Sequence, residues 1–207
     1  MSPPSEASLS RPVDSGQREY SSEERRLLLQ SAHDAIVSTL EGREVLPFTP
    51  STHLAEPRGV FTTLYLIGLL RGCVGHPTAL MPLYRAVTES ARAAAFEDPR
   101  FPPVVLGEAR EVKISLSVLS PLTPILPAQI EVGRHGLLIS GGSGRGLLLP
   151  QVPLEHGWDR NTFLEQTCRK AGLPTDAWRN GAKIKIEAFT AEVFADEGWK
   201  GDVPVCS

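Results

Sequence analysis

The sequence has no apolar run near the roughly 18 to 20 residues that a membrane-spanning helix needs, so we expect no membrane insertion. The stretch from Met1 to Glu19 has no apolar core, and we therefore expect no secretory signal in it. A formal net charge of -3 provides no overall positive field for nucleic acid, so nucleic-acid binding would require a local basic patch. These absences favour a protein of the cytoplasm.

Cysteine and histidine are sparse and scattered. The three cysteines, Cys73, Cys168 and Cys206, are odd in number and widely spaced, which disfavours a disulfide framework and a zinc site built from cysteine alone. We expect reduced thiols. The histidines never fall at the close spacing of a metal-binding pair, so we expect no metal site from local sequence, although ligands from distant segments could still converge.

A chain of 207 residues is long enough for one domain with a sizeable core. Residues 1–20 are rich in serine, proline and charge, and we expect a disordered tail there. We expect a single folded domain over residues 21–196 and a C-terminal tail over residues 197–207.

Hydrophobic periodicity and helix-breaking residues predict the elements of this domain. Apolar residues at helical spacing predict helices, and β-branched or alternating segments predict strands. Helices and hairpins are mixed without a regular βαβ repeat, so we expect an α+β fold with a mostly antiparallel sheet and flanking helices. The expected helices are 22–40, 80–96 and 159–171, and the expected strands are 59–66, 69–74, 112–118, 135–140, 146–149 and 183–189.

The segment Leu70-Arg-Gly-Cys-Val-Gly75 is the first candidate site. Residues two apart on a strand face the same side, so Arg71 and Cys73 would be neighbours, and a nearby cation favours the thiolate form of cysteine. Gly72 and Gly75 would let a ligand approach the backbone. The alternative is that Cys73 only packs in the core and that the glycines mark a bulge.

Other segments offer weaker candidates. Asp98 and Arg100 follow a helix and could meet a ligand beside Cys73 or simply form a turn, while Ser115 lies on a polar strand face that lines the same cleft or meets solvent. The loop 141–146 is rich in glycine, but it lacks the Lys-Ser/Thr of a phosphate-binding loop and precedes a strand, which favours a hairpin turn. His76 is the nearest possible general base.

Several motifs resemble the AMMECR domain family in sequence and in order, most closely its microbial AmmeMemoRadiSam system protein A branch. The motifs are Pro57-Arg-Gly-Val-Phe-Thr-Thr-Leu64, Leu70-Arg-Gly-Cys-Val-Gly75, Ala94-Ala-Phe-Glu-Asp-Pro-Arg-Phe-Pro102, Leu148-Leu-Pro-Gln-Val152 and Gly157-Trp-Asp159. The resemblance implies two lobes around a cleft, with Arg-Gly-Cys as the signature. It also implies a pathway shared with Memo-like and radical-SAM proteins. Val74 departs from the usual isoleucine, and His76-Pro77 follows the motif where many members of the family differ, so a role for His76 would be specific to this chain.

The family resemblance implies no settled reaction, and two hypotheses follow. In the first, the protein is an enzyme in which Cys73 is the nucleophile, Arg71 lowers its pKa, and Asp98 or Arg100 completes the site. In the second, it is a binding or adaptor module for a nucleotide, RNA or a protein, in which Arg58, Arg71 and Arg100 contact phosphates. The sequence does not identify which cofactor either would use, if any.

Overall fold

The computed structural model describes residues 19–44, 50–179 and 183–197. Of the tails expected over 1–20 and 197–207, residues 1–18 and 198–207, which include Cys206, lie outside these residues. The elements are α1 (Ser22–Glu41), β1 (Gly59–Leu66), β2 (Leu69–His76), α2 (Leu83–Phe96), α3 (Leu106–Ala109), β3 (Lys113–Leu119), β4 (Thr123–Pro124), η1 (Pro127–Gln129), β5 (Gly136–Gly141), β6 (Gly144–Leu148), α4 (Val152–Glu155), α5 (Arg160–Lys170), η2 (Ala177–Arg179), β7 (Lys185–Phe189) and β8 (Ala191–Ala195).

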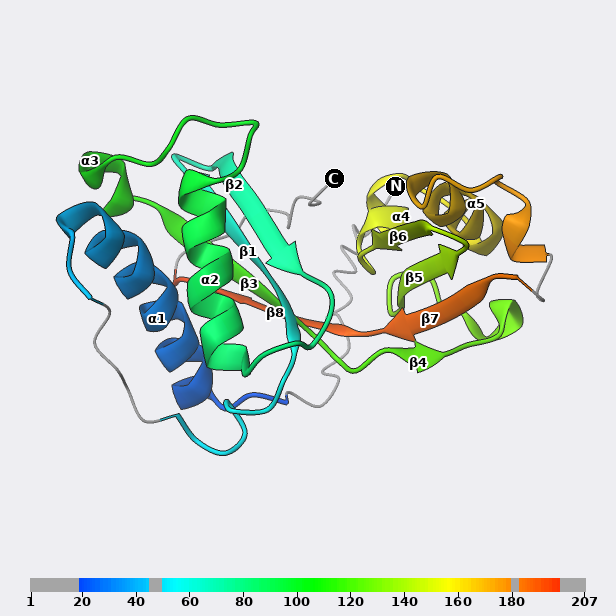
Figure 1. Cartoon of the computed structure of the whole chain (residues 1–207), viewed down its shortest axis with the longest axis horizontal. Helices are drawn as coiled ribbons and strands as arrows, with labels where there is room; N and C mark the ends of the chain where they lie inside the picture. Colours follow the sequence, from blue (N-terminus) through cyan, green and yellow to red (C-terminus); the bar gives the residue numbers. More distant parts are fainter. Residues whose placement is uncertain (1–18, 45–49, 180–182, 198–207) are drawn as a thin grey trace, which may run out of the picture.

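The first sheet has the strand order β2-β1-β3-β8 and is antiparallel throughout. Helices α1 and α2 lie side by side over one face of it, as Figure 1 shows. The sequence defines α1 well, because Ser21 and Glu24 form a reciprocal capping box and Gly42 ends the helix in the left-handed conformation. The first core lies between these helices and the sheet.

Tyr20 belongs to this core, although the sequence prediction placed it in the tail. The residue is 1% exposed, and its ring stacks on His53 with centroids 4.8 Å apart. The folded unit therefore includes the residue immediately before the cap of α1.

The second sheet has the order β4-β7-β5-β6, and α5 packs against β5 and β6. Its own core includes Phe163, Leu164 and Phe189. The whole sheet is inserted between β3 and β8, which are neighbours in the first sheet (Figure 1). At the insertion point the Ser120 amide donates to the Thr190 carbonyl at 2.9 Å, and the Thr190 amide donates to Ser120 Oγ at 2.9 Å.

The predicted α+β class with antiparallel strands is confirmed, but the strands form two sheets where we expected one. The β1–β2 hairpin turns at Ile67 and Gly68, both at positive φ, which matches the twist of a two-residue hairpin loop. Ser115 and Ser117 of β3 are buried, so the polar face predicted for that strand does not meet solvent. Among the described residues no helix is long and apolar enough to cross a membrane.

Candidate ligand pocket between the two sheets

Strand β2 is an edge strand of the first sheet, and the chain after α2 satisfies its outward backbone groups. Asp98 Oδ2 accepts a hydrogen bond from the Cys73 amide at 2.8 Å, and Arg100 Nη2 donates to the Cys73 carbonyl at 3.3 Å. The two side chains also bind each other, with Arg100 Nη2 2.8 Å from Asp98 Oδ2. Together they take the place of a missing neighbouring strand at Cys73.

Hydrogen bonds from the Arg100 guanidinium lower the pKa of the Asp98 carboxyl from 3.8 to about 2. Asp98 is only 5% exposed and accepts four hydrogen bonds from Cys73 and Arg100. These four hydrogen bonds therefore keep the Asp98 carboxyl ionised. This arrangement gives Asp98 and Arg100 a structural task at the sheet edge.

Arg71 does not lie beside Cys73 as strand alternation predicted. The β1–β2 register shifts between Leu64, which pairs with Gly72, and Tyr65, which pairs with Leu70, so that Arg71 is the extra residue of a bulge. Its guanidinium Nη2 lies 2.8 Å from Glu108 Oε2 of α3, and Nη1 donates to the Pro102 carbonyl at 2.8 Å. Arg71 therefore fastens α3 and its preceding loop to the sheet.

The two glycines of the motif allow close packing. A Cβ on Gly72 would overlap the backbone carbonyl of Ala94, so β2 lies directly against α2 at this point. A Cβ on Gly75 would overlap the backbone of Val60 and Phe61 on the paired strand. Gly72 faces the helix, whereas Gly75 lines a pocket.

Cys73 heads a row of small polar residues across the first sheet. It pairs with Thr63 of β1, which pairs with Ser115 of β3, and all three are buried. Thr63 Oγ1 lies 3.1 Å from Cys73 Sγ, while the buried Ser115 hydroxyl has no hydrogen-bond partner.

Cys73 is disulfide-bonded, so the expectation of reduced thiols is wrong for this residue, and Cys168 is the free, buried cysteine of the described residues.

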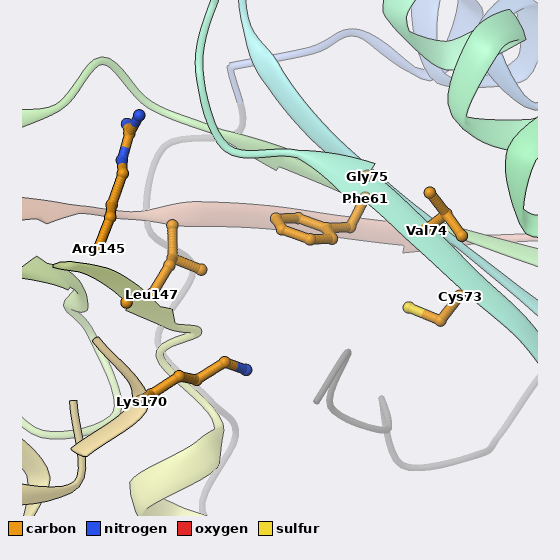
Figure 2. Close-up of a pocket in the computed structure, with 8 residues that line it drawn as sticks. Phe61, Cys73, Val74, Gly75, Arg145, Leu147 and Lys170 are labelled. Carbon is orange, nitrogen blue, oxygen red and sulfur yellow. The ribbon is translucent and has the colours of Figure 1, made fainter. Parts of the chain in front are cut away.

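A pocket of about 360 Å³ lies between the two sheets. Its first wall comes from β1 and β2, and the opposite wall comes from β6 and the end of α5. Figure 2 shows Phe61 and Leu147 pointing toward one another from the two sheets, with Lys170 extending toward the side that carries Cys73. The described lining residues are Phe61, Cys73, Val74, Gly75, Arg145, Gly146, Leu147 and Lys170.

The pocket lining is cationic. It includes Arg145 and Lys170 and no acidic side chain among the residues that the structure describes. Arg145 Nη2 donates to the Thr78 hydroxyl at 3.1 Å, and no described carboxylate forms an ion pair with it. Desolvation lowers the pKa of the Lys170 ammonium. Such a lining is suited to an anion, because the Arg145 guanidinium offers it charge-assisted hydrogen bonds.

Of the residues predicted from sequence, the structure brings only Cys73 and Gly75 into this pocket. Arg58 lies elsewhere, where Nη2 binds Glu19 at 2.9 Å and Glu56 at 2.8 Å. Sequence reasoning missed Phe61, Leu147 and Lys170, because only the tertiary fold joins them. Arg145 had a signal in the sequence, because it lies in the glycine-rich 141–146 segment. That segment contains the predicted hairpin turn, and Arg145 itself lies on β6.

The pocket has no metal-binding character in the described chain. Across residues 19–44, 50–179 and 183–197, no cluster of three or more histidine, cysteine, aspartate or glutamate residues is arranged to hold a metal ion. A cationic, partly apolar lining instead suits an organic or inorganic anion.

Comparison with known proteins gives a consistent match along most of the chain. The AMMECR1 family model matches residues 29–194. Protein MK0488 of Methanopyrus kandleri is 44% identical over 192 residues, covering 87% of this chain and 92% of that protein. A protein of Aquifex aeolicus is 41% identical over 187 residues, covering 86% and 95%. The crystal structure of uncharacterized protein PH0010 from Pyrococcus horikoshii is 42% identical, with a TM-score of 0.72 over 86% of this chain and 93% of that one.

Proposed function

Because the chain belongs to the AMMECR1 family, and its relatives' names state no reaction, we propose a function from the pocket itself: the protein binds a small anionic molecule between its two sheets. The observation that carries this proposal is Arg145, which lines the pocket without a carboxylate partner among the described residues. A guanidinium at a pocket wall favours phosphate or carboxylate, because its planar donors match two oxygens at once.

The three arginines that the second hypothesis named as phosphate ligands support this choice by exclusion. Arg58, Arg71 and Arg100 each bind a described carboxylate, so none of them offers its full charge to a ligand. Arg145 and Lys170 lie together on the wall opposite Cys73 and Gly75. Anion binding by cations is therefore retained from the binding hypothesis, but the cations are now Arg145 of the second sheet and Lys170 of α5.

The test is a titration with inorganic phosphate and pyrophosphate at constant ionic strength. We expect pyrophosphate to raise the melting temperature of the wild-type protein, because a ligand that binds only the folded state stabilises it. Arg145→Gln should weaken the apparent affinity at least tenfold. Arg134→Gln is the matched control, since Arg134 is exposed, is paired with Glu131 and lies outside the pocket lining. Equal shifts in both variants would show that binding is non-specific and would sink the proposal.

A cysteine-centred enzyme in a Memo- and radical-SAM-associated pathway is the second candidate. It is favoured by the position of Cys73 in the same pocket, with the Thr63 hydroxyl 3.1 Å from its sulfur. Because Cys73 is disulfide-bonded in this structure, thiolate chemistry would require its reduction first.

The second candidate is tested by following alkylation against pH with mass spectrometry, with and without reductant. Cys168 is the internal control, because burial raises the pKa of its thiol and should keep it slow. An activated Cys73 should react quickly after reduction, with a midpoint below the free-thiol value of about 8.5. A reduced Cys73 that reacts as slowly as Cys168 would leave only the binding function.

A further inference from the structure

A second pocket, of about 390 Å³, adjoins the first. Lys170 lines both, so the two pockets meet at the C-terminal end of α5. The described lining of the second pocket is Leu148, Val152, His156, Trp158, Gln166, Arg169 and Lys170. These residues come from the Leu148–Val152 and Gly157–Asp159 motifs, from α5 and from His156 at the end of α4 (Val152–Glu155), and neither hypothesis from the sequence used them.

One wall of this second pocket is a stack of two aromatic rings. The His156 and Trp158 ring centroids lie 4.6 Å apart with their planes 17° from parallel. Trp158 is partly buried and packs on the second core, whereas His156 is exposed. Gly157 between them has a φ of 63°, and Asp159 caps α5 by accepting from the Thr162 amide at 2.7 Å. The turn thus holds the Trp158 ring against the core, and the His156 ring lies stacked on it.

The other wall is polar and comes from one side of α5. Gln166, Arg169 and Lys170 lie three and four residues apart, so a single helix face presents them. No acidic side chain appears among the described lining residues, and no described carboxylate pairs with Arg169. The Gln166 amide carries both a donor and an acceptor, which is what the edge of a nitrogen heterocycle requires.

We infer that the two pockets are the two halves of one nucleotide-binding site. The base of a nucleoside monophosphate packs on the His156–Trp158 stack, and its phosphate lies in the first pocket near Arg145 and Lys170. This inference rests on the proposed anion site and adds to it the chemical class of the ligand. Flat rings pack well on aromatic faces, and the contact tolerates any base because each has a π-face.

The experiment compares adenosine monophosphate with ribose 5-phosphate by calorimetric titration of the full chain. The two probes share the phosphate and the sugar, so the ratio of their affinities isolates the base. We expect the nucleotide to bind at least tenfold more tightly. His156→Ala should reduce that ratio to near one without changing ribose 5-phosphate binding, and His156→Phe should retain it, because it keeps an aromatic ring on Trp158.

His53→Ala is the matched control, because His53 forms a similar stack on Tyr20 but lies outside both linings. The ratio should be unchanged in this variant. Equal affinities of the two probes for the wild-type protein would overturn the base subsite and leave the anion site standing. An unchanged ratio in His156→Ala would also overturn it. If inorganic phosphate, pyrophosphate and both probes all fail to bind, the proposed anion site is wrong, and the base subsite that depends on it is wrong as well.

Discussion

At the scale of the residue, the Arg-Gly-Cys motif is explained first by packing. Gly72 is the clearest case, because β2 lies so close to α2 that any side chain would overlap the Ala94 carbonyl. Both partners are backbone, and neither can move without displacing an element. We therefore predict that Gly72→Ala lowers the free energy of unfolding by about 3 kcal/mol or more, at the upper end for overpacked cores.

Urea denaturation followed by circular dichroism checks this prediction. Gly107→Ala is the control, since a Cβ there meets nothing within 4 Å and Gly107 lies in the short helix α3. That variant should be neutral or slightly more stable, because alanine favours helix and restricts the unfolded chain. If the Gly72 variant proves as stable as the Gly107 variant, the close approach of β2 and α2 is not real.

The lowered pKa of the Asp98 carboxyl makes the stability of the protein depend on pH. Its folded pKa of about 2 lies below the ordinary 3.8, so the carboxylate stabilises the folded state above 3.8 and loses that effect as pH falls toward 2. The shift corresponds to about 2 kcal/mol. We predict that Asp98→Asn is destabilised by at least this amount at pH 6, and that the difference from wild type shrinks steadily between pH 4 and pH 2.

Urea midpoints at a series of pH values test this dependence. Asp34→Asn serves for comparison, because Asp34 is an exposed residue of α1 whose carboxylate accepts a hydrogen bond from Gln30. Its small effect should not follow the same pH course. A difference between wild type and Asp98→Asn that stays constant down to pH 2 would contradict the role of the Asp98 carboxylate as acceptor for the Cys73 amide at the sheet edge.

At the scale of the element, the bulge at Arg71 turns a strand residue into an anchor for α3. Arg71 is 9% exposed, and its guanidinium binds Glu108 and the carbonyls of Pro102 and Pro103. Arg71→Met would leave these acceptors without a donor, so we predict a loss of about 3 kcal/mol in stability. A double-mutant cycle with Glu108→Gln should show a coupling of about 1 kcal/mol or more.

The same cycle on Arg26 and Glu23 is the reference, because that pair lies on the exposed surface of α1 at 2.7 Å. Its coupling should be about 0.5 kcal/mol or less. Equal couplings for the two pairs would mean that Arg71 does not anchor α3.

The elements themselves were largely predictable, because their signals are local. The capping box at Ser21, the alternation of β3 and the glycine-marked hairpins all depend on neighbours in sequence. The bulge at Arg71 was not predictable, since it depends on the register with β1. The pocket was predictable only in part: Cys73 and Gly75 lie in a visible motif, but Arg145, Lys170 and Phe61 meet them only through the packing of two sheets.

At the scale of the whole molecule, the second sheet is an insertion into the first. Every residue of the first core lies outside residues 121–189, and Ser120 and Thr190 are hydrogen-bonded where the insertion begins and ends. Insertions of this kind are tolerated because the ends of the inserted segment lie close together. We predict that replacing residues 121–189 with Asn-Gly, which favours a two-residue hairpin, leaves a folded first sheet with α1 and α2.

Circular dichroism should show retained helix and a cooperative urea transition in this shortened protein, with a lower midpoint because Leu119 and Phe61 lose their contacts with the second core. Pyrophosphate should no longer raise its melting temperature, since Arg145 and Lys170 are gone. A chain that fails to unfold cooperatively would mean that the first core depends on the second. A shortened chain that still binds pyrophosphate as tightly as the full chain would place the anion site outside the pocket between the sheets.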